Sequence, residues 1–200
     1  MPAPTYKNYI PRNAITLVEE LLDDKSIRIV LKTERKTKHG DYKRLSKHQH
    51  QISINTNLNP YRFLITFIHE VAHFEAFQKY GYGIKPHGKE WKSAFQHMML
   101  PFLRPDIFPK ALLPILAQHF KNPKASSDSD MKLALTLKQY DNANEKVYVF
   151  EIPEGDRFKL YNGKVFVKGK KRRKRIECQE LGTQRLYLFN PIAEVEHLTA

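Results

Sequence analysis

Two histidines and a glutamate lie together with a spacing that suits metal chemistry. The segment is His69-Glu70-Val71-Ala72-His73. On an α-helix, residues four apart differ by about 400° of rotation and about 6 Å of rise, so both imidazoles would project from one face. Two neutral imidazoles so placed can bind one Zn²⁺ at Zn–N distances of about 2.0–2.1 Å. Glu70, about 100° round the helix from His69, could then take a proton from a water molecule that the metal acidifies.

Two imidazoles leave a catalytic zinc site one protein ligand short. The nearby side chains that could supply it are Glu75, His87, Glu90 and His97. Glu75 is a poor candidate because it points about 200° away from His73 on the helix. His87 is favoured because the turn-rich residues 81–86 can fold back on the first helix, and because the start of a following helix could fix its ring. Glu90 would serve instead in a His-His-Glu site.

The elements that must position these residues are marked in the sequence. Asn59 can cap the metal-binding helix, Pro60 suits its first position, and Gly81 follows its last periodic residue. Further helices are expected from Gly88 to Leu100 and over residues 13–24 and 110–120. Strands are expected at residues 27–31 and 51–55, on either side of a basic segment, residues 32–47, with a turn at Gly40-Asp41. This segment could line the approach to the metal.

A linker-like stretch, residues 125–130, predicts a boundary between two domains, residues 1–124 and 125–200. After it the pattern changes to short strands, at residues 132–137, 146–152, 157–161, 164–168, 173–178 and 185–189. Asn162-Gly163 is a strong two-residue hairpin signal between two of them. The predicted fold is therefore α+β, with helices and a small sheet first and a small antiparallel β module second.

Composition narrows the class of protein. The chain has 200 residues, of which 41% are hydrophobic, enough for a buried core and against global disorder. Its one cysteine, Cys178, excludes an internal disulfide and a site of several thiolates, and we expect it to be a small apolar strand residue. Without a secretory signal or an apolar run near the roughly 20 residues that span a bilayer, we expect a cytoplasmic protein with no membrane partner.

The formal net charge of +13 favours an anionic partner, of which nucleic acid is the commonest. Residues 168–175 hold seven basic side chains, which we expect at the exposed tip of a hairpin: Lys168, Lys170, Lys171, Arg172, Arg173, Lys174 and Arg175. Contacts from such a tip to phosphates would bind DNA, single-stranded or structured, in a salt-sensitive manner. Interleaved aromatics could stack on bases, although such residues usually form the module's core. The alternative for the tip is a solvated turn.

The two histidine motifs together resemble a known family. His69-Glu70-Val71-Ala72-His73, followed fourteen residues later by His87-Gly88-Lys89-Glu90-Trp91, is similar to the HExxH and HGxx[WF] motifs of SprT-like metalloproteases. The resemblance covers roughly residues 10–122 and implies a zincin-like catalytic core. It implies that His69, His73 and His87 bind one zinc ion, that Glu70 is the general base, and that Trp91 packs in the core.

The resemblance also implies an activity. It predicts a zinc-dependent metalloendopeptidase that hydrolyses peptide bonds, and the family includes the Spartan proteases, which degrade proteins crosslinked to DNA. Many bacterial members end in a zinc ribbon with two pairs of cysteines, whereas this chain has only Cys178, so we expect a metal-free β module in the ribbon's place. The rival hypotheses are a nucleic-acid-binding protein with a structural or vestigial zinc site, and a zinc hydrolase acting on a non-peptide bond.

Overall fold

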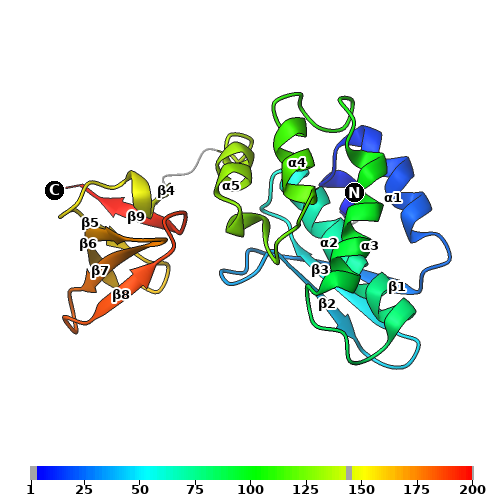
Figure 1. The fold of residues 1–200 in the computed structure, drawn as a ribbon, viewed down its shortest axis with the longest axis horizontal. Coiled ribbons are helices and arrows are strands. Elements are labelled where there is room, and N and C mark those ends of the chain that lie inside the picture. Colours follow the sequence, from blue (N-terminus) through cyan, green and yellow to red (C-terminus); the bar gives the residue numbers. More distant parts are fainter. Residues whose placement is uncertain (1–3, 143–145, 200) are drawn as a thin grey trace. The chain divides into compact units, whose positions relative to one another are not determined.

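The computed structural model describes residues 4–142 and 146–199, which form two compact units, Met1–Asp141 and Asn142–Ala200 (Figure 1). Helices and sheets are both present, which confirms the predicted α+β class. The units divide after Asp141 and not after residue 124, where the linker-like stretch predicted the boundary. The reason is that Leu133 and Leu137, beyond this stretch, are part of the buried core of the first unit.

The first unit combines helices with a three-stranded sheet of order β1-β3-β2. Its elements are η1 (Tyr6–Asn8), η2 (Arg12–Ala14), α1 (Ile15–Leu22), β1 (Ile27–Lys32), β2 (Gly40–Arg44), β3 (His50–Asn55), α2 (Pro60–Tyr80), α3 (Lys89–Met99), η3 (Leu100–Phe102), α4 (Leu113–Phe120), η4 (Ser127–Ser129) and α5 (Met131–Lys138). Strand β3 runs parallel to β1 and antiparallel to β2. The predicted turn at Gly40-Asp41 is wrong, because these residues begin β2 and pair with Ile54 and Ser53.

Helix α2 is the central element of this unit and has the predicted ends. The Asn59 side chain accepts a hydrogen bond from the backbone N–H of Arg62, Pro60 is the first helical residue, and Gly81 follows with a φ of 68°. The helix is 21 residues long, and residues on several of its faces are buried, with α3, β2 and β3 packed against it. No helix among the described residues is both long and apolar enough to cross a membrane.

The segment predicted as a strand at residues 132–137 is a helix, α5. Its leucines alternate as in a strand, but Asp130 accepts a hydrogen bond from the backbone N–H of Leu133 and so caps a helix. Helical geometry also brings Leu133 and Leu137 to one face, where both are fully buried.

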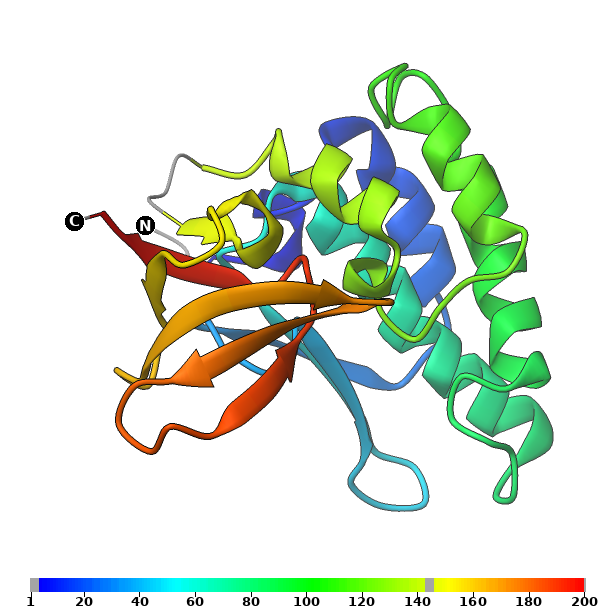
Figure 2. The same ribbon diagram turned by 60° about the vertical axis from the view of Figure 1, so that its left-hand side comes forward.

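The second unit is an antiparallel β module, as predicted, with a sheet of order β4-β9-β5-β6-β7-β8. Its elements are β4 (Lys146–Tyr148), η5 (Val149–Glu151), β5 (Arg157–Lys159), β6 (Val165–Arg172), β7 (Arg175–Glu180), β8 (Leu186–Phe189) and β9 (Glu194–Leu198). Gly163, with a φ of 82°, lies in the turn between β5 and β6, at the predicted hairpin. Cys178 is buried beside Phe158, Phe166 and Ile176 in the module's core. Figure 2 shows β6 and β7, in orange, as a long twisted hairpin.

Candidate metal centre

Helix α2 places His69 and His73 one turn apart, and their Nε2 atoms lie 3.2 Å from each other. The Nε2 atom of His87 lies 3.1 Å from each of them. A tetrahedral Zn²⁺ ion with Zn–N distances of about 2.05 Å separates its nitrogen ligands by about 3.3 Å. A neutral imidazole carries only one N–H. Three ring nitrogens at such spacing are therefore better suited to binding one shared cation than to hydrogen-bonding with one another. The three histidines therefore fit one zinc ion.

The loop before α3 holds His87 in an unusual backbone conformation. His87 has a φ of 58°, in the left-handed region that few non-glycine residues adopt. The next residue, Gly88, donates its backbone N–H to the carbonyl of Lys85, and a Cβ at Gly88 would lie 2.9 Å from that same oxygen. This tight turn explains a glycine directly after the histidine. It also brings the His87 imidazole to His69 and His73 on α2, just before α3 begins.

The buried Trp91 ring packs against all three imidazoles. Its side chain is 1% exposed, and its ring centroid lies 4.5, 5.3 and 4.7 Å from those of His69, His73 and His87. Its indole N–H donates to the backbone carbonyl of His69 at 3.3 Å. The expected core role of Trp91 is confirmed, and its contacts restrict the rotation of every candidate ligand.

The electrostatics of the cluster keep the imidazoles neutral. Burial, reinforced by the neighbouring histidines, lowers the pKa of His69 to about 2 and that of His73 to about 4. Burial also lowers the pKa of His87. Since a metal binds the neutral ring through its lone pair, protons compete poorly for this site at neutral pH.

Glu70 is 6% exposed and lies against strand β2. Burial, followed by the nearby charge of Asp41, raises the pKa of its carboxyl group to about 8, although the backbone N–H of Tyr42 favours the ionised form. Gly40 approaches so closely that a Cβ there would lie 2.7 Å from Oε1 of Glu70 and 2.7 Å from Cγ2 of Thr66. Strand β2 therefore forms a wall that determines where the Glu70 carboxyl group can lie.

A cavity of about 580 Å³ contains the whole cluster. Its lining includes His69, Glu70, His73 and His87, together with residues 35–42 and 124–128. The other candidate ligands are elsewhere: Glu75 pairs with Lys25 at 3.2 Å, and neither Glu90 nor His97 belongs to the cluster. Among the described residues, the histidine triad is the one group arranged to hold a metal ion.

The lining includes residues that the sequence did not single out for the site. The Tyr42 ring lies parallel to that of His73, with centroids 6.5 Å apart, and its hydroxyl is 2.9 Å from Nδ1 of His50. His119, on α4, is 3.0 Å from Asp130 through Nδ1. Asp128, in η4, belongs to residues 125–130, which the sequence predicts as a linker. Their positions depend on tertiary packing, so no local pattern could have found them.

The basic residues occupy two places. Arg35, Lys36 and Lys38 line the cavity, consistent with the predicted approach to the metal. The second group forms the β6–β7 hairpin, with Arg173 and Lys174 at its turn. Two of its members have partners within the module: Lys168 donates to the carbonyls of Phe150 and Ile152, and Arg172 pairs with Glu177 at 3.2 Å. The exposed members without an ion pair to a described residue are Lys170, Lys171, Arg173, Lys174 and Arg175.

The fold and the site define a class. The domain is α+β, with a small sheet beside a helix that carries two histidines one turn apart and a glutamate between them. A third histidine, from the following loop, completes a group that could hold a metal ion. The model of the SprT-like family matches residues 8–107, half of the chain, so this protein belongs to the SprT-like family. No curated protein sequence matches the chain significantly.

Proposed function

We propose that this protein is a zinc-dependent metalloendopeptidase whose substrates include DNA-bound or DNA-crosslinked proteins. The observation that supports it best is that one open cavity contains three converging imidazole nitrogens and the buried carboxyl group of Glu70, the residue directly after His69. A purely structural metal site has no need for Glu70. The family to which the chain belongs supports a metallopeptidase role.

In this mechanism, His69, His73 and His87 hold zinc through Nε2. Zinc, when bound, is a Lewis acid that acidifies water and polarises the scissile carbonyl. Glu70 takes a proton from the attacking water and then passes it to the leaving amine. Its raised pKa suits a group that must gain and lose a proton near neutral pH, and a neighbouring dication would lower that pKa again. Gly40 and Tyr42 hold the carboxyl group in place.

The open shape of the cavity supports a polypeptide substrate. Strand β2 is at the edge of its sheet and residues 40–42 line the cavity, so an extended chain could lie along it. The exposed cations of the β6–β7 hairpin support a DNA partner, since phosphate contacts need cations that are not already neutralised. DNA bound there would keep a DNA-associated substrate close to the protease.

The test measures metal content and cleavage for wild type and Glu70→Gln, with and without single-stranded DNA. We expect one zinc per chain in both proteins, and cleavage of the chain itself or of a DNA-bound protein by wild type alone. Cleavage by the Gln variant would disprove the role of Glu70. Full zinc occupancy in His87→Ala would disprove the proposal that His87 is the third zinc ligand.

The alternative is a nucleic-acid-binding protein in which the zinc site is structural or vestigial, and the exposed cations of the hairpin favour it. A purified protein that binds DNA and zinc, yet cleaves neither itself nor a DNA-bound protein, would establish this alternative.

A further inference from the structure

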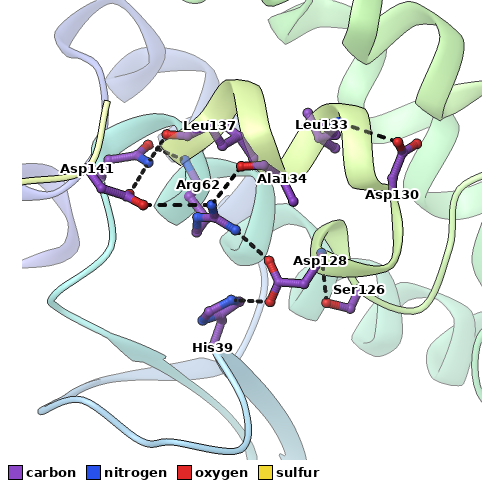
Figure 3. Close-up of polar contacts among 10 residues, drawn as sticks. His39, Arg62, Ser126, Asp128, Asp130, Leu133, Ala134, Leu137 and Asp141 are labelled. Atoms are coloured by element: carbon purple, nitrogen blue, oxygen red, sulfur yellow. Dashed lines mark hydrogen bonds and ion pairs between the residues drawn. The ribbon is translucent and has the colours of Figure 1, made fainter. Parts of the chain in front are cut away.

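Asp128 connects two walls of the cavity that are far apart in the sequence. Its Oδ1 atom lies 2.5 Å from Nη1 of Arg62 on α2, and its Oδ2 atom lies 2.6 Å from Nε2 of His39, the residue directly before β2 (Figure 3). The segment that carries Asp128 lines the cavity as well. We call the contacts of Arg62, Asp128 and His39 the Asp128 bridge.

The Arg62 end of the bridge is firmly held. The Arg62 side chain is 6% exposed, and its guanidinium also donates to the carbonyl of Ala134 and lies 3.8 Å from Asp141 (Figure 3). Asp128 is in turn fixed by its own backbone N–H, which donates to the Ser126 hydroxyl at 3.1 Å. Burial raises the pKa of Asp128, but hydrogen bonds from His39 and Arg62 outweigh it and hold the pKa below its usual value. The bridge therefore contains a carboxylate at neutral pH.

The His39 end of the bridge lies next to Gly40, which packs against Glu70. The carbonyl of His39 accepts a hydrogen bond from the backbone N–H of Asn55 at 2.9 Å, which starts the pairing of β2 with β3. The next residue, Gly40, lies so close to Glu70 that an added Cβ would be 2.7 Å from its Oε1 atom. A shift of the His39 backbone would therefore move the wall against which the Glu70 carboxyl group rests.

We propose that Asp128 is a positioning residue, which acts through His39 to hold the start of β2 against Glu70. This inference rests on the proposed peptidase function for its catalytic readout. The family match ends at residue 107, so Asp128 lies outside it and the match assigns it no role. Residues 125–130, which the sequence predicts as a linker, would thus contribute to catalysis within the first unit.

The experiment compares His39→Ala, Asp128→Ala and the double variant with wild type. Asp128→Ala leaves the buried Arg62 with fewer partners and could fail to fold, whereas His39→Ala leaves the Asp128–Arg62 pair intact. Asp106→Ala is the matched control, because it removes the ion pair with Arg104, 2.5 Å long, from a surface that does not line the cavity. His39→Gln should rescue activity, because its amide nitrogen can still donate to Asp128.

The readouts are kcat and KM on one peptide, zinc content, and hydrogen exchange of the Asn55 backbone amide. We expect His39→Ala to lower kcat about 10- to 100-fold, the effect of displacing a reacting group by a fraction of an ångström to 1 Å. KM and zinc content should stay close to those of wild type. The double variant should lose no more than about threefold beyond the worse single variant, since both remove the same contact. Exchange at Asn55 should accelerate in both single variants and not in Asp106→Ala.

Two results would overturn the inference: unchanged Asn55 exchange in His39→Ala, or losses of kcat that multiply in the double variant. A third result would have a different meaning: wild type cleaves no substrate, but Asn55 exchange still accelerates in both single variants. It would refute the proposed peptidase function and leave the positioning of β2 by Asp128 established.

Discussion

Replacing Gly40 with Ala should damage catalysis without removing the metal. The added Cβ would lie 2.7 Å from Oε1 of Glu70 and 2.9 Å from its Cγ. Ordinary van der Waals contact begins at 3.4 Å, so the carboxyl group or the strand must move by 3.4 − 2.7 = 0.7 Å. The three heavy atoms nearest to this Cβ belong to Glu70 and Thr66 and not to a histidine, so zinc binding should be retained.

The size of the effect follows from this displacement. Overpacking a tightly packed site costs about 1–3 kcal/mol, and the smaller conformational freedom of Ala in the unfolded chain offsets about 0.4–1 kcal/mol of it. We expect a net loss between about 0 and 2.6 kcal/mol in the free energy of unfolding, with a central value of about 1.3 kcal/mol. Since a misplacement of about 1 Å can lower a rate about 100-fold, a movement of 0.7 Å should lower kcat at least about tenfold.

The assay combines urea denaturation with peptide cleavage and metal analysis. Gly182→Ala is the matched control, because a Cβ there meets nothing within 4 Å, and it should leave kcat and zinc content unchanged. Wild-type kcat in Gly40→Ala would refute the reasoning, because it would mean that the position of Glu70 does not depend on β2. Loss of zinc from this variant would also contradict it.

Three further predictions concern the metal, the pH and the charge. Trp91→Phe removes the indole N–H bound to the His69 carbonyl, so we expect zinc affinity, measured by chelator competition, to fall about tenfold; unchanged affinity would show that this contact does not orient the ligand. In metal-free protein, the pKa of Glu70 is about 8 when folded and near 4.5 when unfolded, so the folded state binds the extra proton and stability should fall as pH rises from 6.5 to 8, by roughly 1 kcal/mol per unit. Glu70→Gln should lack this slope in urea denaturation with a chelator, and an identical slope in both proteins would refute the assignment. The triple variant Arg173→Ser, Lys174→Ser and Arg175→Ser should reduce the slope of log Kd for DNA against log salt by about 2–3 and leave cleavage of a free peptide unchanged, whereas an unaltered slope would place the DNA contacts elsewhere.

The sequence predicted the parts of the site that depend on local periodicity. The spacing of His69 and His73 fixes their common face because a helix repeats every 3.6 residues, whatever surrounds it. Asn59, Pro60 and Gly81 set the ends of that helix through contacts within a few residues. The residues around His87 and the family resemblance favour it as the third ligand, and the structure brings its Nε2 atom to 3.1 Å from the Nε2 atoms of both other histidines.

Other predictions failed where tertiary packing overrides a local pattern. The alternating leucines of residues 132–137 suit a strand, but burial of Leu133 and Leu137 against the core favours a helix, and the local Asp130 cap stabilises it. Residues 125–130 have a linker composition, but Asp128 binds Arg62 and His39, and the boundary moves to Asp141. Gly40-Asp41 has turn composition, but pairing with β3 makes it the start of a strand.

The sequence by itself therefore determined the helix, its ligating face and the residue types that can hold a metal. Only the tertiary structure decided what surrounds Glu70: Gly40 against its carboxyl group, and the Asp128 bridge behind Gly40. The physical reason is the range of the contacts. Residues four apart meet on any helix, but Asp128 is 66 residues from Arg62 and 89 from His39, and only the packing of α2, β2 and η4 brings them together.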